Sequence, residues 1–166
     1  MRRRPRFVVN RGLFEEYGIP LPTDYASFAA ACKAFDEAGI RGFTADYLYD
    51  YTCMETLQGL SATELKSTEG RKWRTAYSDP AGTARVGLDN TVWPGVFARM
   101  EQFIRDTGLT AADLELNYDA VTGNVRQGGA CHVLWQLRRR TDVPRARHRR
   151  DLFAVLQPER EMLMTT

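Results

Sequence analysis

The stretch Thr23-Asp24-Tyr25-Ala26-Ser27-Phe28 contains the clearest helix start in the chain. Thr23 is a favourable N-cap residue, because its hydroxyl can accept a hydrogen bond from the first turn, and Asp24 suits the positive end of the helix dipole. The apolar side chains that follow are Tyr25, Phe28, Cys32 and Phe35. Their spacings of three, four and three residues place them on one face of a helix, and Gly39 predicts its end.

Strands are expected on both sides of this helix. A short apolar run at 7–9 comes before it, followed by a brief helix at 11–17, and residues 40–45 come directly after it. Strand, helix and strand in succession indicate an α/β fold.

Most of the remaining chain has helical patterning. The longest apolar face with a 3.6-residue period begins after Asp89 or Thr91 and ends near Gly108, and Pro94 is tolerated in its first turn. Other expected elements are a helix at 50–60, a short helix opened by a Ser61–Glu64 capping box, a turn around Trp73 and Tyr77, helical segments at 110–116 and 118–121, and a strand at 130–135.

The composition is that of a globular domain. Of the 166 residues 43% are hydrophobic and 11% aromatic, which suffices for one domain with a core. No apolar run approaches the roughly 18 residues of a membrane span, and the start lacks the apolar region of a secretory signal, so a cytoplasmic location is expected for the chain as written. Cys32, Cys53 and Cys131 lack metal-ligand spacing, so we expect free thiols, no metal and no cofactor.

The charge is distributed unevenly along the chain. Residues 1–6 hold four arginines and residues 138–150 hold seven, whereas residues 7–137 carry 11 Lys and Arg against 17 Asp and Glu, a net charge of −6. The central part is therefore acidic and the two ends are basic.

The stretch Thr44-Ala45-Asp46-Tyr47-Leu48-Tyr49-Asp50-Tyr51-Thr52 is the candidate recognition site. In a strand its three tyrosines would share one face, and in a loop leading into a helix they would fan around a turn. Aromatic rings can pack against the C–H faces of a sugar, and neighbouring carboxylates accept hydrogen bonds from its hydroxyls. A tyrosine-rich strand in an ordinary core is the alternative.

Four further runs occur in a characteristic order across residues 7–132. They are Asn10-Arg11-Gly12-Leu13-Phe14-Glu15-Glu16-Tyr17-Gly18-Ile19-Pro20, Pro22-Thr23-Asp24-Tyr25-Ala26-Ser27-Phe28, Val86-Gly87-Leu88-Asp89 with the helix after it, and Val125-Arg126-Gln127-Gly128-Gly129-Ala130. In this order they resemble the extracellular solute-binding proteins of bacterial carbohydrate ABC transporters, the family 1 or maltose-binding-like class.

The resemblance implies a helix-rich α/β fold, one lobe of a type II periplasmic-binding-protein-like architecture, in a chain that is a fragment of the family's two-lobed protein. It implies that a sugar or oligosaccharide is captured outside the cytoplasm and delivered to an ABC permease, without an enzymatic reaction. By position in the family, Tyr49 and Tyr51 are the best candidates to contact sugar. Asp46, Tyr47 and Asp50 come next, and Trp135 is a further candidate stacking residue.

The resemblance divides the chain into three parts. Residues 7–137 correspond to part of a C-terminal-type lobe, residues 138–158 form a basic tail, and residues 159–166 again resemble a family segment. Loss and return of the resemblance suggest that residues near 131–158 come from a shifted reading frame. We expect the isolated half-site to bind sugar weakly or not measurably, and an exposed apolar face to promote self-association.

Two other classes of function match parts of the sequence. The arginine run from Arg138 to Arg150 could neutralise phosphates in a nucleic-acid-binding protein, but the acidic central part opposes this and no nucleic-acid-binding motif accompanies the run. Asp46, Asp50 or Glu55 could supply the paired carboxylates of a glycoside hydrolase. Acidic residues are common enough in this chain to make that pairing a weak signal.

Overall fold

The computed structural model describes residues 6–81, 86–88, 92–126, 132–135 and 154–156. Strand β1 (Arg6–Val9) lies in the middle of a three-stranded sheet of order β2-β1-β3. It pairs antiparallel with β2 (His132–Trp135) and with β3 (Ala154–Leu156). The expected strands at 7–9 and within 130–135 are present. Strand β3 was not predicted, and it falls inside the segment assigned to the basic tail.

The first two helices begin at side-chain caps. Helix α1 (Arg11–Glu16) begins after Asn10, whose side chain accepts from the backbone N–H of Leu13. Helix α2 (Tyr25–Glu37) begins after Asp24, whose carboxylate accepts from the Ser27 N–H at 2.7 Å while Ser27 Oγ accepts from the Asp24 N–H at 3.1 Å. The predicted cap at Thr23 is therefore wrong by one residue, because Asp24 makes this reciprocal capping box.

The predicted apolar face of α2 contributes to two hydrophobic clusters. The first joins α2 to β1 and α1 and consists of Val9, Leu13, Phe14, Ala31 and Phe35. The second joins α2 to helices α3 (Asp50–Leu60) and α6 (Trp93–Asp106) and consists of Phe28, Cys32, Phe43, Ala45, Tyr47, Leu60 and Phe103. In the second cluster the Phe28 and Phe103 rings stack with centroids 6.2 Å apart. Helix α2 thus connects the sheet to the long helix α6.

The strand expected at 40–45 does not form. Only isolated bridges occur there, at Arg41 and Thr44, although Phe43, Thr44 and Ala45 are fully buried. The Arg41 Nε–H donates to the Phe43 carbonyl at 2.9 Å, so a side chain satisfies a backbone group that a strand would pair with a neighbour. The segment is an extended, buried connection from α2 to α3.

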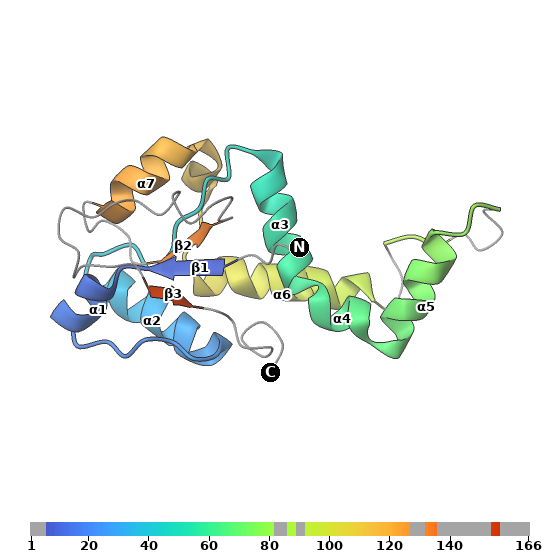
Figure 1. The fold of residues 1–166 in the computed structure, drawn as a ribbon, viewed down its shortest axis with the longest axis horizontal. Coiled ribbons are helices and arrows are strands. Elements are labelled where there is room, and N and C mark those ends of the chain that lie inside the picture. Colours follow the sequence, from blue (N-terminus) through green and yellow to red (C-terminus); the bar gives the residue numbers. More distant parts are fainter. Residues whose placement is uncertain (1–5, 82–85, 89–91, 127–131, 136–153, 157–166) are drawn as a thin grey trace.

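Helices α4 (Ala62–Lys66) and α5 (Thr68–Tyr77) extend to one side of the molecule, away from the sheet (Figure 1). The expected Ser61–Glu64 capping box is wrong. Ser61 Oγ donates to the Gln58 carbonyl at 3.0 Å, and the Glu64 carboxylate instead accepts from Arg99 Nε of α6 at 2.5 Å. The expected turn at Trp73 and Tyr77 lies within α5, and their rings stack with centroids 4.8 Å apart.

The last helical segments lie close to the start of α3. They are the 3-10 helix η1 (Ala111–Glu115), capped by Thr110 as expected, and helix α7 (Tyr118–Arg126), which is longer than the turn predicted there. Helix α6 has Pro94 in its first turn, and its predicted start at 89–91 lies outside the described residues.

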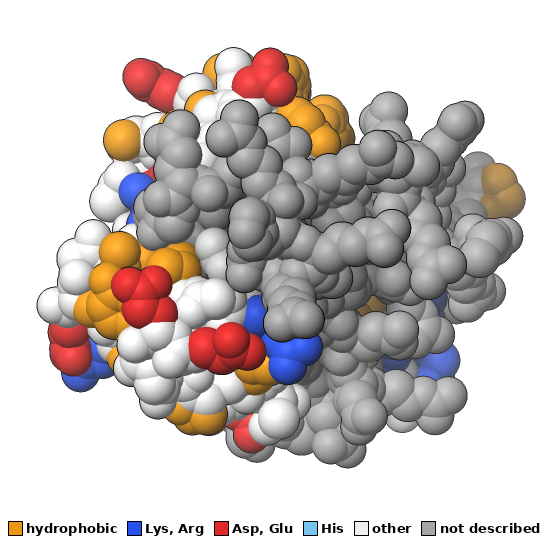
Figure 2. Space-filling model, turned by 60° about the vertical axis from the view of Figure 1, so that its left-hand side comes forward, with side chains coloured by type: hydrophobic (Ala, Val, Ile, Leu, Met, Phe, Trp, Pro, Cys, Tyr) orange, Lys and Arg blue, Asp and Glu red, His pale blue; other side chains and the backbone are white. Residues whose placement is uncertain are grey.

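Figure 2 shows hydrophobic and acidic side chains next to one another on the described part of one face. No helix in the described ranges is long and apolar enough to cross a membrane.

Candidate ligand-binding site

The tyrosine stretch adopts the second of its two expected geometries, a loop leading into a helix. Tyr49 has an extended backbone and is the N-cap residue of α3, and Tyr51 lies in the first turn. The Tyr49 N–H donates to the Asp46 carbonyl at 3.3 Å, and the Thr52 N–H donates to the Tyr49 carbonyl at 3.0 Å. These bonds turn the chain tightly, so the three tyrosines do not share a face.

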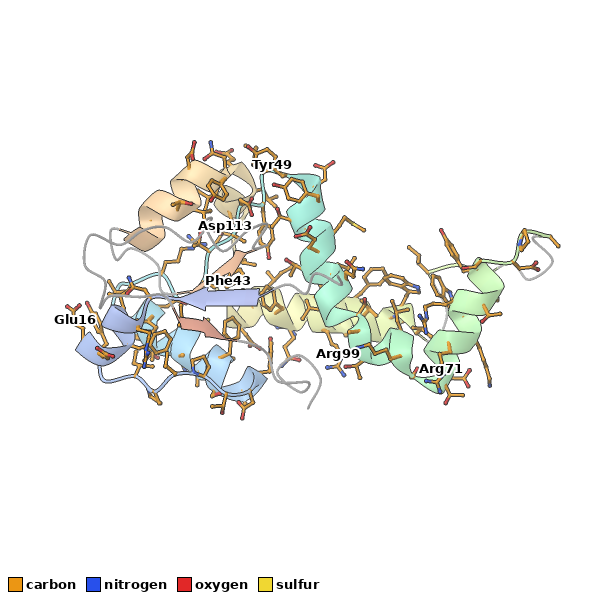
Figure 3. All side chains as sticks on the ribbon, in the orientation of Figure 1. Glu16, Phe43, Tyr49, Arg71, Arg99 and Asp113 are labelled. Atoms are coloured by element: carbon orange, nitrogen blue, oxygen red, sulfur yellow. The ribbon has the colours of Figure 1, made fainter. Side chains whose placement is uncertain are left out.

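Tyr49 and Tyr51 form an exposed stacked pair at this helix start (Figure 3). Their ring centroids are 5.6 Å apart with 19° between the ring planes, and the residues are 40% and 49% exposed. Stacking occupies the facing sides of the two rings, so the flat aromatic surface available to a ligand is an outward ring face of the pair. Such a surface can pack against another flat, partly apolar group.

Tyr47 lies below this surface in the hydrophobic core. It is 6% exposed, and its hydroxyl lies 3.0 Å from Thr56 Oγ1 of α3. Burial raises the pKa of the Tyr47 phenol above its ordinary value. Tyr47 thus supports the start of α3 from inside, and the structure does not bring its ring to the surface formed by Tyr49 and Tyr51.

The two candidate carboxylates differ in their surroundings. Asp46 is half-buried, and burial raises its pKa above the ordinary value. Asp50 is exposed and is the first residue of α3. One acceptor therefore comes just before the aromatic pair along the chain, and the other lies on the helix between the two tyrosines.

The site is held in place by a segment far away in sequence. The Leu48 N–H donates to the Leu116 carbonyl at 3.1 Å, which joins the tyrosine stretch to the end of η1. Exposed apolar side chains from both segments accompany the tyrosine pair: Leu48, Met54, Leu114 and Tyr118. Leu48 belongs to the stretch quoted from the sequence, but sequence reasoning missed Leu114 and Tyr118, because nothing in a local pattern indicates that residues 48 and 116 are neighbours.

Trp135 is the remaining candidate. It is the last residue of β2 and is paired in register with Arg6 of β1. The backbone thus places it at one end of the sheet, and its role in binding stays a prediction.

Metal-binding groups are absent from the part of the chain that the structure describes. No cluster of three or more His, Cys, Asp or Glu side chains could hold a metal ion there. Cys32 is buried and Cys53 is partly buried, and both are free thiols, whereas Cys131 lies outside the described residues.

Comparison with known proteins establishes the fold. No family model matches the sequence, and no curated protein sequence matches it. Solved structures do match. RafE from Streptococcus pneumoniae, in its apo form, is 18% identical with a TM-score of 0.57, covering 80% of this chain and 34% of that one. A sugar transporter from Arthrobacter chlorophenolicus A6 with bound laminaribiose is 14% identical with a TM-score of 0.53, covering 79% and 31%.

A third match comes from work on xylan utilization by the thermophilic bacterium Caldanaerobius polysaccharolyticus. It is 18% identical with a TM-score of 0.56, covering 79% of this chain and 31% of that one. The described residues thus adopt a helix-rich fold shared with part of a type II periplasmic-binding protein. The chain spans about a third of the length of the solved structures that it matches.

Proposed function

We propose that this chain takes part in non-covalent binding of a sugar or oligosaccharide, at the surface formed by Tyr49 and Tyr51. The observation that carries the proposal is the exposed, nearly parallel stacking of these two rings beside Asp46 and Asp50. In this role the chain captures the sugar outside the cytoplasm, without catalysing a reaction, and delivers it to an ABC permease for uptake. The fold is consistent with this role, because structures that share it are described with bound raffinose, stachyose and laminaribiose.

The chemistry of the surface suits a carbohydrate. The C–H face of a pyranose can pack on an outward face of the stacked phenol rings, and the carboxylates of Asp46 and Asp50 can accept hydrogen bonds from the sugar hydroxyls. An ionised carboxylate makes shorter and stronger hydrogen bonds than a neutral acceptor. The surface therefore offers both the apolar and the polar contacts that a sugar presents.

Binding by this surface alone is expected to be weak. A typical small-molecule site encloses most of its ligand, whereas an exposed aromatic pair covers one side only and leaves the other side in water. We expect a dissociation constant in the millimolar range, equivalent to about 4 kcal/mol of binding free energy. Calorimetry showing micromolar binding would contradict this expectation.

The proposal can be tested by titrating the chain with raffinose, stachyose and laminaribiose at millimolar concentrations and recording the NMR signals of the tyrosine rings. Signals of Tyr49 and Tyr51 are expected to shift with at least one of the three sugars. Tyr49→Ala is expected to reduce the slope of the response about fivefold, which corresponds to roughly 1 kcal/mol of lost ring packing.

Tyr77→Ala is the matched control. Tyr77 is also an exposed tyrosine stacked on another aromatic ring, but it lies on α5, away from the proposed site. This variant is expected to keep the wild-type response. No shift of the Tyr49 and Tyr51 signals with any of the sugars, or an equal loss in both variants, would refute the proposal.

The nucleic-acid alternative gains no support from the residues that the structure describes. The run from Arg138 to Arg150 lies outside them. The carboxylates of Asp46 and Asp50 beside the aromatic pair would repel phosphate.

A further inference from the structure

A buried carboxylate on η1 connects to the tyrosine stretch from beneath. Asp113 is 1% exposed, and its Oδ2 accepts from the Thr110 N–H at 2.7 Å and from the Thr110 hydroxyl at 3.1 Å. The Arg41 guanidinium forms an ion pair with the same carboxylate. A carboxylate removed this fully from water requires such partners, because an unpaired buried charge is strongly destabilising.

Arg41 transmits this anchor to the segment that leads to the site. Its side chain is 33% exposed at the ion pair, and its Nε–H donates to the Phe43 carbonyl at 2.9 Å. One guanidinium thus joins η1 to the beginning of the extended connection at 41–48. Arginine suits this task, because its planar fork can serve a carboxylate and a carbonyl at once.

The same turn of η1 holds the other end of that connection. The Leu116 N–H donates to the Asp113 carbonyl at 3.2 Å, and the Leu116 carbonyl accepts from the Leu48 N–H at 3.1 Å. The connection at 41–48 is therefore attached to η1 at both ends, and Tyr49 is the next residue. Figure 3 shows Asp113 near the helix start that carries Tyr49.

Two further contacts concern the support beneath the site. Burial is the main cause of the raised pKa of the Tyr47 phenol, and the charge of Asp113 is a smaller cause in the same direction, whereas the hydrogen bond to Thr56 lowers this pKa. Gly42, between the two attachment points of Arg41, has its N–H bonded to Asp36 Oδ1 at 2.8 Å, so the connection is also held against α2. These contacts leave little freedom for the backbone that sets the direction of the Tyr49 ring.

We propose that Asp113 is a positioning residue for the sugar-binding pair Tyr49 and Tyr51, acting through Arg41 and through the turn to Leu116. This inference rests on the proposed function, because it assigns the reason why the two rings keep their orientation. It differs from a purely structural role, in which the Asp113–Arg41 pair would stabilise the fold and leave the ring pair unaffected.

The Glu64–Arg99 pair provides a matched comparison. It also joins two elements that are far apart in sequence, α4 and α6, and its side chains are 17% and 25% exposed. In Figure 3 Arg99 lies away from Tyr49, between α4 and α6. Glu64→Gln therefore breaks a partly buried ion pair without touching the connection at 41–48.

The experiment compares wild type, Asp113→Asn, the double variant Arg41→Met with Asp113→Asn, and Glu64→Gln, all in the full chain. Asparagine keeps an acceptor for the Thr110 N–H. The double variant leaves no unpaired buried charge but removes the Arg41 bond to the Phe43 carbonyl, so its thermal stability is expected to fall below that of wild type by about the cost of one lost buried hydrogen bond. Each variant is measured for Tm, for the ring-current shifts of the Tyr49 and Tyr51 protons, and for the slope of its response to raffinose.

The expected result separates stability from positioning. The double variant should have a Tm only slightly below that of wild type, lose the ring-current shifts, and show a raffinose response up to about fivefold smaller, the loss expected when the Tyr49 ring itself is removed. Glu64→Gln should keep both the ring-current shifts and the response. Arg41→Lys, which keeps the charge but loses the Nε–H bond to Phe43, provides a milder change if the other variants fail to fold.

Unchanged ring-current shifts in the double variant and in Arg41→Lys would overturn the inference, as would an equal change in Glu64→Gln. If wild type itself fails to respond to raffinose and the other two sugars, the proposed function fails. The ring-current shifts still decide in that case whether Asp113 positions the pair.

Discussion

Asp46 carries its negative charge in a half-buried position, where the ionised form is poorly solvated. Its pKa is raised above the ordinary value of 3.8, chiefly by burial. A folded-state pKa above the unfolded value means that the folded chain binds the proton more tightly. The folded state therefore loses stability as the pH rises through the folded-state pKa, and the ionised carboxylate persists at neutral pH at the expense of stability.

Asp46→Asn is accordingly expected to raise the free energy of unfolding at pH 7, because the neutral amide carries no charge to desolvate. The gain should disappear when the pH falls below about 3.8, where Asp46 is protonated in both states. Urea unfolding at the two pH values measures this difference.

The same variant should show a smaller raffinose response, because the amide is a weaker acceptor than a carboxylate. Asp50→Asn, at the exposed first position of α3, is the control and should change stability by less than about 0.5 kcal/mol. A less stable Asp46→Asn at pH 7 would show that the carboxylate has partners that outweigh its burial.

At the scale of residues, the sequence named the candidate tyrosines and carboxylates of the proposed site but not their arrangement. The alternation at 47, 49 and 51 could not show which ring is buried, because that depends on whether the chain turns before α3. The turn is made by backbone bonds, from Tyr49 to Asp46 and from Leu48 to Leu116. The second bond joins residues far apart in the chain, and no local pattern encodes it.

Among the elements, α6 contributes the central aromatic ring of the larger core cluster. Phe103 is 1% exposed, stacks on Phe28 and meets Phe43 edge to face with centroids 5.2 Å apart. Phe103→Ala is expected to destabilise the fold by about 3–5 kcal/mol, because it removes buried area and leaves a cavity. Denaturant unfolding of wild type and Phe103→Ala measures this loss in the free energy of unfolding.

Phe97→Ala on the same helix is the control, since Phe97 is 40% exposed and its truncation leaves no enclosed cavity. Its effect should be much smaller than that of Phe103→Ala. Equal effects of the two substitutions would contradict the assignment of the core to the Phe103 face.

Helices α4 and α5 approach so closely that only glycine fits at their contact. A Cβ on Gly70 would lie 2.0 Å from the Glu64 carbonyl oxygen and 2.6 Å from Leu65 Cα, both backbone atoms that cannot rotate away. Gly70→Ala is therefore expected to destabilise this pair of helices by at least about 1–3 kcal/mol. Unfolding followed by the fluorescence of Trp73, which lies on α5, reports on this region.

Gly123→Ala in α7 is expected to have the opposite effect and to raise the free energy of unfolding. Among the described residues, and apart from its chain neighbours and the backbone of its own helix, nothing lies within 4 Å of a Cβ at Gly123. Alanine should therefore stabilise that helix by up to about 1 kcal/mol through its higher helix propensity. If Gly70→Ala and Gly123→Ala destabilise the fold equally, the close approach of α4 and α5 is not the cause of the Gly70→Ala effect.

Helices were predicted from the sequence more accurately than strands. The apolar periodicities of α2 and α6 are local and strong, and both helices lie where expected. Residues 40–45 have the composition of a strand, but a strand also requires neighbours with free backbone groups. Arg41 satisfies the Phe43 carbonyl instead, and Asp113, which holds Arg41, is 72 residues away along the chain.

For the whole molecule, the apolar surroundings of the tyrosine pair predict self-association. Leu48, Tyr51 and Met54 are 49%, 49% and 61% exposed at one end of α3, and Leu114 and Tyr118 are exposed on the neighbouring segment. An apolar surface of this kind is uncommon on a monomer unless something binds it. We expect light scattering to show oligomers whose mass decreases on dilution.

Replacing Leu48 and Met54 together by serine should shift this equilibrium towards the monomer, because it removes apolar area while keeping the tyrosine pair. Tyr77→Ser on α5 removes an equally exposed apolar side chain elsewhere and should leave the equilibrium unchanged. A monomeric wild type at high concentration would show that the surface does not bind a second copy.

Strand β1 lies between two partners that come from much later in the chain. Val9 pairs with His132 on one side and with Ala154 on the other, so both ladders span well over a hundred residues. During translation β1 leaves the ribosome before either partner has been made, so its pairing waits until β2 and β3 have been synthesised, and closure of the long intervening loops slows it further. Until then the nascent chain carries a strand with two open edges, and a holdase chaperone should increase the soluble yield more than it increases the final stability.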